Sequence, residues 1–131
     1  MNVTGFWTGE YNYGAGSPAK VSFDAELTQT GTTLFGHSTE QNTFDVKAGQ
    51  ILIADLCGKV SGHDVSFSKS YTNTSSIRDK IIYKGALSDD GHLITGSWSI
   101  IGVFTGRFRM TRAIEQTPKA KAVTAKETED A

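Results

Sequence analysis

Residues 91–112 read Gly91-His-Leu-Ile-Thr-Gly-Ser-Trp-Ser-Ile-Ile-Gly-Val-Phe-Thr-Gly-Arg-Phe-Arg-Met-Thr-Arg112. Large apolar residues alternate with polar ones on both sides of Ile101-Gly102, which is the pattern of half-buried antiparallel strands. A glycine, Gly96 or Gly106, lies on the apolar face of each half, and such a glycine marks a bend in a sheet or a close approach of another group. The stretch therefore predicts two strands of a curved sheet joined by a tight connection.

The preceding residues repeat this alternation. We expect further strands at about 6–13, 20–28, 33–41, 51–60, 65–71 and 80–87, with no helix between them. Eight short strands at this spacing are typical of an all-β sandwich or barrel. Inner-face glycines at positions 9, 36, 58, 85, 96 and 106 favour the barrel, since closure needs curvature on nearly every strand. The predicted fold is an eight-stranded antiparallel up-and-down β-barrel, and a two-sheet sandwich is the alternative.

The lengths of the connections predict a barrel that is closed at one end. In a meander, successive connections alternate between the two ends. The connections after the second, fourth and sixth strands are tight, whereas those after the first, third and fifth are longer. Strand direction then assigns Trp7 and Arg112 to the closed floor. It assigns Tyr13, Glu40, Lys69 and Tyr71 to the mouth.

Length and composition limit the other possibilities. The chain has 131 residues, room for one domain, which we place at 1–114. Residues 115–131 are rich in Ala, Lys and Glu, and we expect a disordered or weakly helical tail. The net charge is −1, which predicts neither nucleic acid nor a membrane as partner. The single cysteine, Cys57, excludes an internal disulfide and is expected to be a small, semi-buried hydrophobic residue.

The first residues and the apolar runs of the sequence do not predict a targeting signal or a membrane span. Residues 1–7 lead directly into the first strand. They contain neither the basic segment nor the apolar segment of a signal peptide, so we expect no export. No apolar run approaches the roughly 20 residues of a membrane helix. The expected location is the cytoplasm.

Gly5-Phe6-Trp7 resembles the Gly-x-Trp signature that opens the first strand in the calycin superfamily of lipocalins, fatty-acid-binding proteins and avidins. In lipocalins this Trp packs on a basic residue of the last strand, so the resemblance implies that Trp7 and Arg112 form a barrel-closing pair. A guanidinium over an indole face is favourable in itself. The chain is shorter than a lipocalin and lacks its disulfides and helix, and it lacks avidin's closing motif. The resemblance is therefore to a distant, bacterial-type calycin family.

The inner faces of the strands carry polar groups that packing alone does not require. Buried charge is costly unless paired, so Glu40 and Lys69 should pair directly or through a ligand. Tyrosines combine an apolar body with a hydroxyl tip, which suits a small amphipathic ligand. The alternative is a polar plug that reaches water at the mouth. The predicted ligand-binding residues are Tyr11, Tyr13, Ser38, Glu40, Lys69, Tyr71, Tyr83 and Trp98.

These residues predict non-catalytic binding of a small hydrophobic or amphipathic molecule, with neither cofactor nor metal. The first alternative is a protein-interaction or enzyme-inhibitor barrel with a packed interior. The second is an acid/base isomerase or cyclase that uses Glu40 and Tyr71. Against an enzyme, the sequence shows no nucleophile elbow, phosphate loop or metal-ligand spacing, and the histidines fall on outer faces or turns. Outward Ile51, Ile53 and Leu93 further predict a homodimer through the outer barrel wall.

Overall fold

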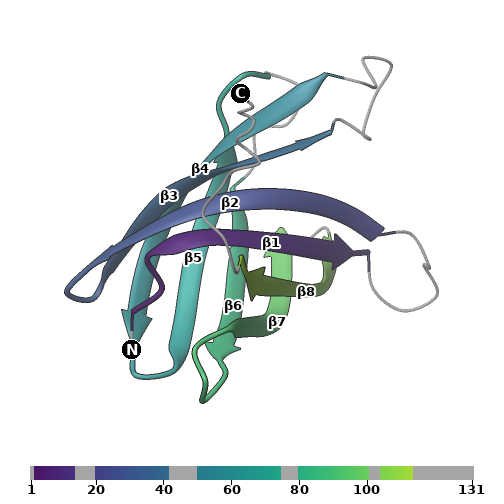
Figure 1. Cartoon of the computed structure of the whole chain (residues 1–131). Helices are drawn as coiled ribbons and strands as arrows, with labels where there is room; N and C mark the ends of the chain where they lie inside the picture. The colour runs from purple at the N-terminus through teal and green to yellow at the C-terminus, as the bar shows by residue number, and fades with distance from the viewer. Residues whose placement is uncertain (1, 14–19, 42–49, 75–79, 101–103, 114–131) are drawn as a thin grey trace.

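The computed structural model describes residues 2–13, 20–41, 50–74, 80–100 and 104–113, and these form eight strands (Figure 1). The strands lie within one or two residues of the predicted ranges. The largest difference is at the second strand, which continues to Thr30 because its turn is only two residues long. The strands are β1 Gly5–Asn12, β2 Lys20–Thr30, β3 Thr33–Gln41, β4 Ile51–Ser61, β5 Asp64–Tyr71, β6 Ile81–Leu87, β7 Leu93–Ile100 and β8 Phe104–Arg112.

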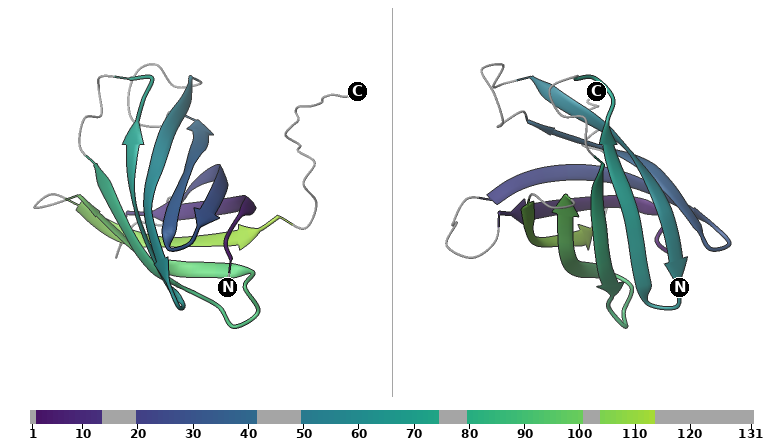
Figure 2. Two further views of the ribbon diagram at one scale, coloured as in Figure 1. Left: turned by 90° about the vertical axis from the view of Figure 1, so that its left-hand side faces the viewer. Right: turned by 180° about the vertical axis from the view of Figure 1, so that it is seen from behind.

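Each strand pairs antiparallel with its neighbours in sequence, and β1 pairs with β8 to close the sheet into a barrel. The predicted fold is confirmed, and the two-sheet sandwich is wrong. The strands tilt strongly, so the wall of β1, β2 and β8 crosses the wall of β4, β5 and β6 at a steep angle (Figure 1, Figure 2). Such tilt is the geometric requirement for closing eight strands. Within the described residues there is no helix, and hence none long and apolar enough to span a membrane.

Three short turns close one end of the barrel. They connect β2 to β3, β4 to β5 and β6 to β7, as predicted from the connection lengths. Each turn contains a glycine with a positive φ: Gly31 at 62°, Gly62 at 59° and Gly91 at 77°. Other residues adopt this conformation only at a cost, so glycine makes these reversals possible. The four connections at the predicted mouth, 14–19, 42–49, 75–79 and 101–103, lie outside the described residues, as does the tail from 114 onwards.

Close strand crossings explain two of the inner glycines. A Cβ added at Gly58 would lie 1.9 Å from the backbone oxygen of Ser66, and one at Gly96 would lie 2.0 Å from that of Lys84. Neither site has room for a side chain. Glycine at these positions lets neighbouring strands bend tightly enough to close the barrel.

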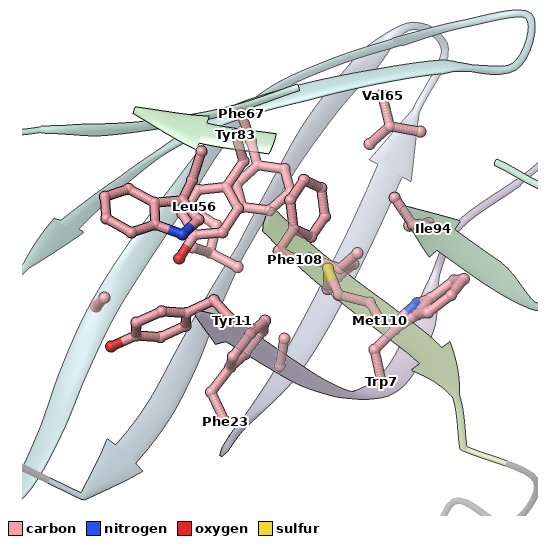
Figure 3. Close-up of a cluster of buried hydrophobic side chains, with 14 of the residues drawn as sticks. Trp7, Tyr11, Phe23, Leu56, Val65, Phe67, Tyr83, Ile94, Phe108 and Met110 are labelled. Carbon is pink, nitrogen blue, oxygen red and sulfur yellow. The ribbon is translucent and has the colours of Figure 1, made fainter. Parts of the chain in front are cut away.

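The interior is lined by the alternate residues that the two-residue period predicts. Figure 3 shows the core running from Trp7, Met110 and Ile94, on the right of the view, to Tyr11 and Phe23 on the left. In between, the rings of Phe67 and Tyr83 stack at 4.9 Å, and Phe108 meets Tyr83 edge-on at the same distance. Aromatic packing of this kind adds about 0.5–1.5 kcal/mol per pair beyond burial alone.

Cys57 is exposed, and the expectation that it is semi-buried is wrong. It lies between inward Leu56 and inward Gly58 on β4, so the alternation turns it outward. Phe35, its cross-strand neighbour on β3, is exposed for the same reason.

Candidate ligand site in the barrel interior

The floor of the barrel is closed by Arg112 and Trp7, as the resemblance implied. The Arg112 guanidinium carbon lies 4.6 Å from the centroid of the Trp7 ring. The guanidinium donates to the backbone oxygens of Asn2 at 2.8 Å, Thr4 at 2.9 Å and Gly91 at 3.1 Å. It therefore ties the N-terminal segment and the β6–β7 turn to the last strand.

Val3 completes the floor and was missed by sequence reasoning. It is fully buried, and its carbonyl accepts a hydrogen bond of 2.9 Å from the Trp7 indole nitrogen. Val3 precedes the first strand, so no strand period could assign it a face. Because the Trp7 indole N–H already donates within the protein, it is not available to a ligand. We therefore assign the floor a structural role.

Glu40 and Lys69 form a direct ion pair inside the barrel, as expected. Their residues are only 4% and 1% exposed, so the prediction of a plug that reaches water is wrong for this pair. The hydroxyl of Tyr11 donates to the second carboxylate oxygen, Oε2, at 2.6 Å. Both carboxylate oxygens of Glu40 are thus engaged, one by each neighbour.

Four aromatic rings surround the Lys69 ammonium. Its nitrogen lies 5.0 Å from the ring centroids of Tyr11 and Phe23, 5.1 Å from that of Tyr71 and 5.7 Å from that of Tyr83. These distances lie within the range of cation–π attraction, which is worth about 2 kcal/mol when the site is desolvated. The alternation of residues along β2 marks Phe23 as inward, but it does not indicate that Phe23 lies beside Lys69.

Burial changes the acid–base properties of the site. Desolvation lowers the pKa of the Lys69 ammonium, although the nearby Glu40 carboxylate acts in the opposite direction. Desolvation also raises the pKa of the Tyr11, Tyr71 and Tyr83 hydroxyls, and the negative charge of Glu40 raises each of them further. The tyrosines are therefore held as neutral hydrogen-bond donors at physiological pH.

Ser38 brings a polar group without a partner to the same wall. It is buried two residues before Glu40 on the inner face of β3, and its hydroxyl has no hydrogen-bond partner among the described residues. Its cross-strand neighbours are Ala25 and Ala54, whose methyl groups offer no acceptor. An unsatisfied buried hydroxyl costs about 1–3 kcal/mol.

Tyr13 and Trp98 lie beside Tyr11 at the upper edge of the described barrel. Their rings meet edge-on at 5.8 Å, and each lies 6.0 Å from the Tyr11 ring. The Trp98 indole donates to the Asn12 carbonyl at 2.8 Å, so it offers a ligand only an apolar surface. Tyr13 is 36% exposed, the most accessible of the predicted ligand-binding residues.

Seven of the eight predicted residues thus form one connected group, and Ser38 lies on the same face of β3 as Glu40. The rings of Tyr11 and Tyr71 lie beside the Glu40–Lys69 ion pair. Tyr83 also lies beside Lys69 and connects the pair to the aromatic core by stacking on Phe67. Among the residues that the structure describes, no three His, Cys, Asp or Glu side chains lie close enough to hold a metal ion. His37 faces outward, 3.4 Å from Glu26.

No protein-family model matches this chain, and no curated protein matches it. A functional interpretation therefore depends on the chemistry of the interior, and the calycin relationship stays a prediction.

Proposed function

We propose that the protein binds a small hydrophobic or amphipathic molecule in the upper half of the barrel, without catalysis. The observation that carries this proposal is a buried ion pair ringed by aromatic side chains, with the unpartnered Ser38 hydroxyl on the same inner face of β3 as Glu40. A core that served packing alone would gain stability by replacing Ser38 with alanine and the pair with apolar residues. A ligand that satisfies these groups supplies a reason for their presence.

The residues around the ion pair provide the two kinds of contact that a small-molecule ligand requires, apolar and polar. Aromatic faces provide apolar contact area, and a few polar groups fix orientation, which is the usual composition of small-molecule sites. Tyr13 and Trp98 form the wall nearest the mouth, so they are proposed to be the first residues that an entering ligand meets. The calycin relationship, which we also propose, agrees with this use of a barrel.

A ligand screen with matched variants tests the proposal. Purified protein is screened by thermal shift and native mass spectrometry against fatty acids, retinoids, flavonoids, haem and small aromatic acids. A bound ligand stabilises the folded state by about 2.7 kcal/mol at a hundred times its Kd. Tyr71→Phe and Lys69→Met should reduce the shift. Ser38→Ala should raise the melting temperature of the free protein yet weaken the ligand-induced shift.

Thr39→Ala is the control for the Ser38 variant. Thr39 is the next residue on β3 and is exposed on the outer wall. It should leave the ligand-induced shift unchanged. An absence of shift with every ligand class, or an equal loss in both variants, would contradict an interior site.

The outer wall supports the second candidate function, protein interaction. Phe35, Ile51 and Ile53 are 46%, 48% and 41% exposed and all lie on the outer faces of β3 and β4. Exposed apolar groups that cluster in this way often mark association surfaces. A groove of about 440 Å³ lies on the same wall, lined by Glu26, Thr28, Phe35, Gly36, His37, Asp55, Leu56 and Cys57.

The predicted homodimer through this wall is tested by light scattering after size exclusion. Self-association should make the mass depend on concentration, and Ile53→Ser together with Phe35→Ser should abolish that dependence. A constant monomer mass in the parent protein would exclude the homodimer. The isomerase or cyclase alternative, which pairs Glu40 with Tyr71, has weaker support, because the two oxygens of the Glu40 carboxylate accept hydrogen bonds from Lys69 and Tyr11.

A further inference from the structure

We propose that Lys69 captures a small apolar aldehyde or ketone as a Schiff base, with Glu40 as the counter-ion of the product. The inference rests on the proposed function, because the carbonyl compound must first enter the barrel. It narrows the ligand to one chemical class and adds a covalent bond to the binding site.

The surroundings of Lys69 are those of a reactive amine. Its nitrogen lies inside a ring of four aromatic faces, and the residue is 1% exposed. Burial in an apolar pocket favours the neutral amine, which is the nucleophilic form, and this is how proteins activate lysines toward carbonyl groups. The direction of the Lys69 pKa agrees with the geometry.

The hydrogen-bond inventory of the site points to an acceptor. A lysine ammonium has three donors, and within the described residues only Glu40 accepts from Lys69. Ser38 adds a hydroxyl without a partner, whereas both oxygens of Glu40 are occupied. The donors of the site therefore outnumber the hydrogen bonds that they make, and the carbonyl oxygen of an entering ligand can accept from one of them. A carboxylate ligand would instead add an uncompensated negative charge to an interior that is neutral, at high cost.

The chemistry balances with the groups present. A proton moves from the Lys69 ammonium to the Glu40 carboxylate, which frees the nitrogen lone pair. The amine attacks the carbonyl carbon, and the carbon–oxygen π electrons move to oxygen, which takes a proton from nitrogen to give a carbinolamine. Glu40 then returns its proton to that hydroxyl, water leaves, and the nitrogen lone pair forms the carbon–nitrogen double bond. No oxidant or reductant is involved.

The product fits the electrostatics that the barrel already has. A protonated Schiff base carries one positive charge on the same nitrogen, so the net charge of the interior is unchanged. Glu40 remains beside it, Tyr11 still donates to Glu40, and the aromatic faces still surround a cation. The site therefore needs no new charge compensation when the bond forms.

Reductive trapping tests the inference on the full chain. The protein is incubated near neutral pH with benzaldehyde and sodium cyanoborohydride, and benzylated peptides are then quantified by mass spectrometry. Lys84, exposed on the neighbouring strand β6, is the internal control. Lys84 lies in water, outside the ring of aromatic faces that encloses Lys69, so Lys69 should be labelled at least about tenfold more than Lys84. Glu40→Gln should reduce the Lys69 label, whereas Lys84→Arg should not.

Two measurements separate the inference from the proposed function. Thermal shifts measured without the reductant report binding, and toluene, which has no carbonyl group, can bind only non-covalently. Stabilisation by either probe without preferential labelling of Lys69 overturns the Schiff base and leaves the interior ligand site standing. If the probes neither stabilise the protein nor label Lys69, the Schiff base is overturned. If the ligand screen described above also gives no shift, the interior ligand site is overturned as well. The ratio of the two labels in the parent protein decides the question even if a variant fails to fold.

Discussion

The floor and the upper half of the barrel each hold a cation against aromatic side chains, but they satisfy it differently. At the floor, Arg112 stacks on Trp7 and donates to three backbone carbonyls at the edge of the barrel. In the upper half, Lys69 is enclosed by four rings and depends on one carboxylate, that of Glu40. The first arrangement ties the segment before β1 and the β6–β7 turn to β8, whereas the second keeps a charge away from water.

The difference shows that arginine suits a structural contact, whereas a buried lysine can take part in chemistry. A guanidinium stays charged under all ordinary conditions and has five fixed donors, so it suits a permanent connection. An ammonium can lose its proton when buried, so the upper cation can change state and the floor cation cannot. If this comparison is right, unpairing should destabilise the protein more in the upper region than at the floor, and alkaline pH should act through the upper region.

The largest expected effect comes from unpairing the upper cation. Glu40→Leu leaves the Lys69 charge buried without a partner and should lower the free energy of unfolding by about 3–5 kcal/mol. The double variant Glu40→Leu with Lys69→Met removes both charges and should recover most of this loss. Urea unfolding of the parent and the two variants measures it. A double variant as unstable as the single one would show that the ion pair does not cause the loss.

Alkaline pH should destabilise the protein through the same upper region. Tyr11, Tyr71 and Tyr83 have folded-state pKa values raised above their ordinary 10.0, so above that pH the unfolded chain releases protons that the folded chain retains. Stability is full below pH 10 and is lost as pH rises, by about 1.4 kcal/mol per pH unit for each tyrosine. The lowered Lys69 pKa acts oppositely only up to its ordinary value of 10.5.

Tyrosinate absorbance measures this effect directly. In the folded protein the signal should stay low above pH 10 and then appear in one step together with the loss of far-ultraviolet circular dichroism. The chain unfolded in urea should titrate smoothly near pH 10. A smooth titration of these tyrosines in the folded protein would contradict their burial with Glu40.

The smallest of the three effects is expected at the floor. Arg112→Met removes a cation–π contact and three hydrogen bonds, but the carbonyls that it contacts lie partly at the surface and can bind water. We expect a loss of about 1–3 kcal/mol in the free energy of unfolding. Arg109→Met, exposed on the outer face of β8, should change it by less than about 0.5 kcal/mol. Equal effects of the two substitutions would show that the floor contacts are not stabilising.

Much of the architecture could be predicted because strands have a period of two. That period assigned every inward residue of the described strands, and tight turns with glycine assigned the closed end. The same period placed Glu40 and Lys69 in one enclosed space, where the cost of buried charge predicted their pairing. It also turned Cys57 outward, against the general tendency of cysteine to be buried.

The calycin resemblance implied the Trp7–Arg112 pair. By itself, the sequence determined the strand order, the faces of the strands and the Glu40–Lys69 pair. These follow from alternation, turn chemistry and charge, which are local properties. Only the tertiary structure decided that Phe23 joins three tyrosines around Lys69, that Val3 fills the floor and that Ser38 has no partner within the described chain. The physical reason is that these contacts depend on strand tilt and register, which bring together side chains from strands that are not neighbours in the sheet.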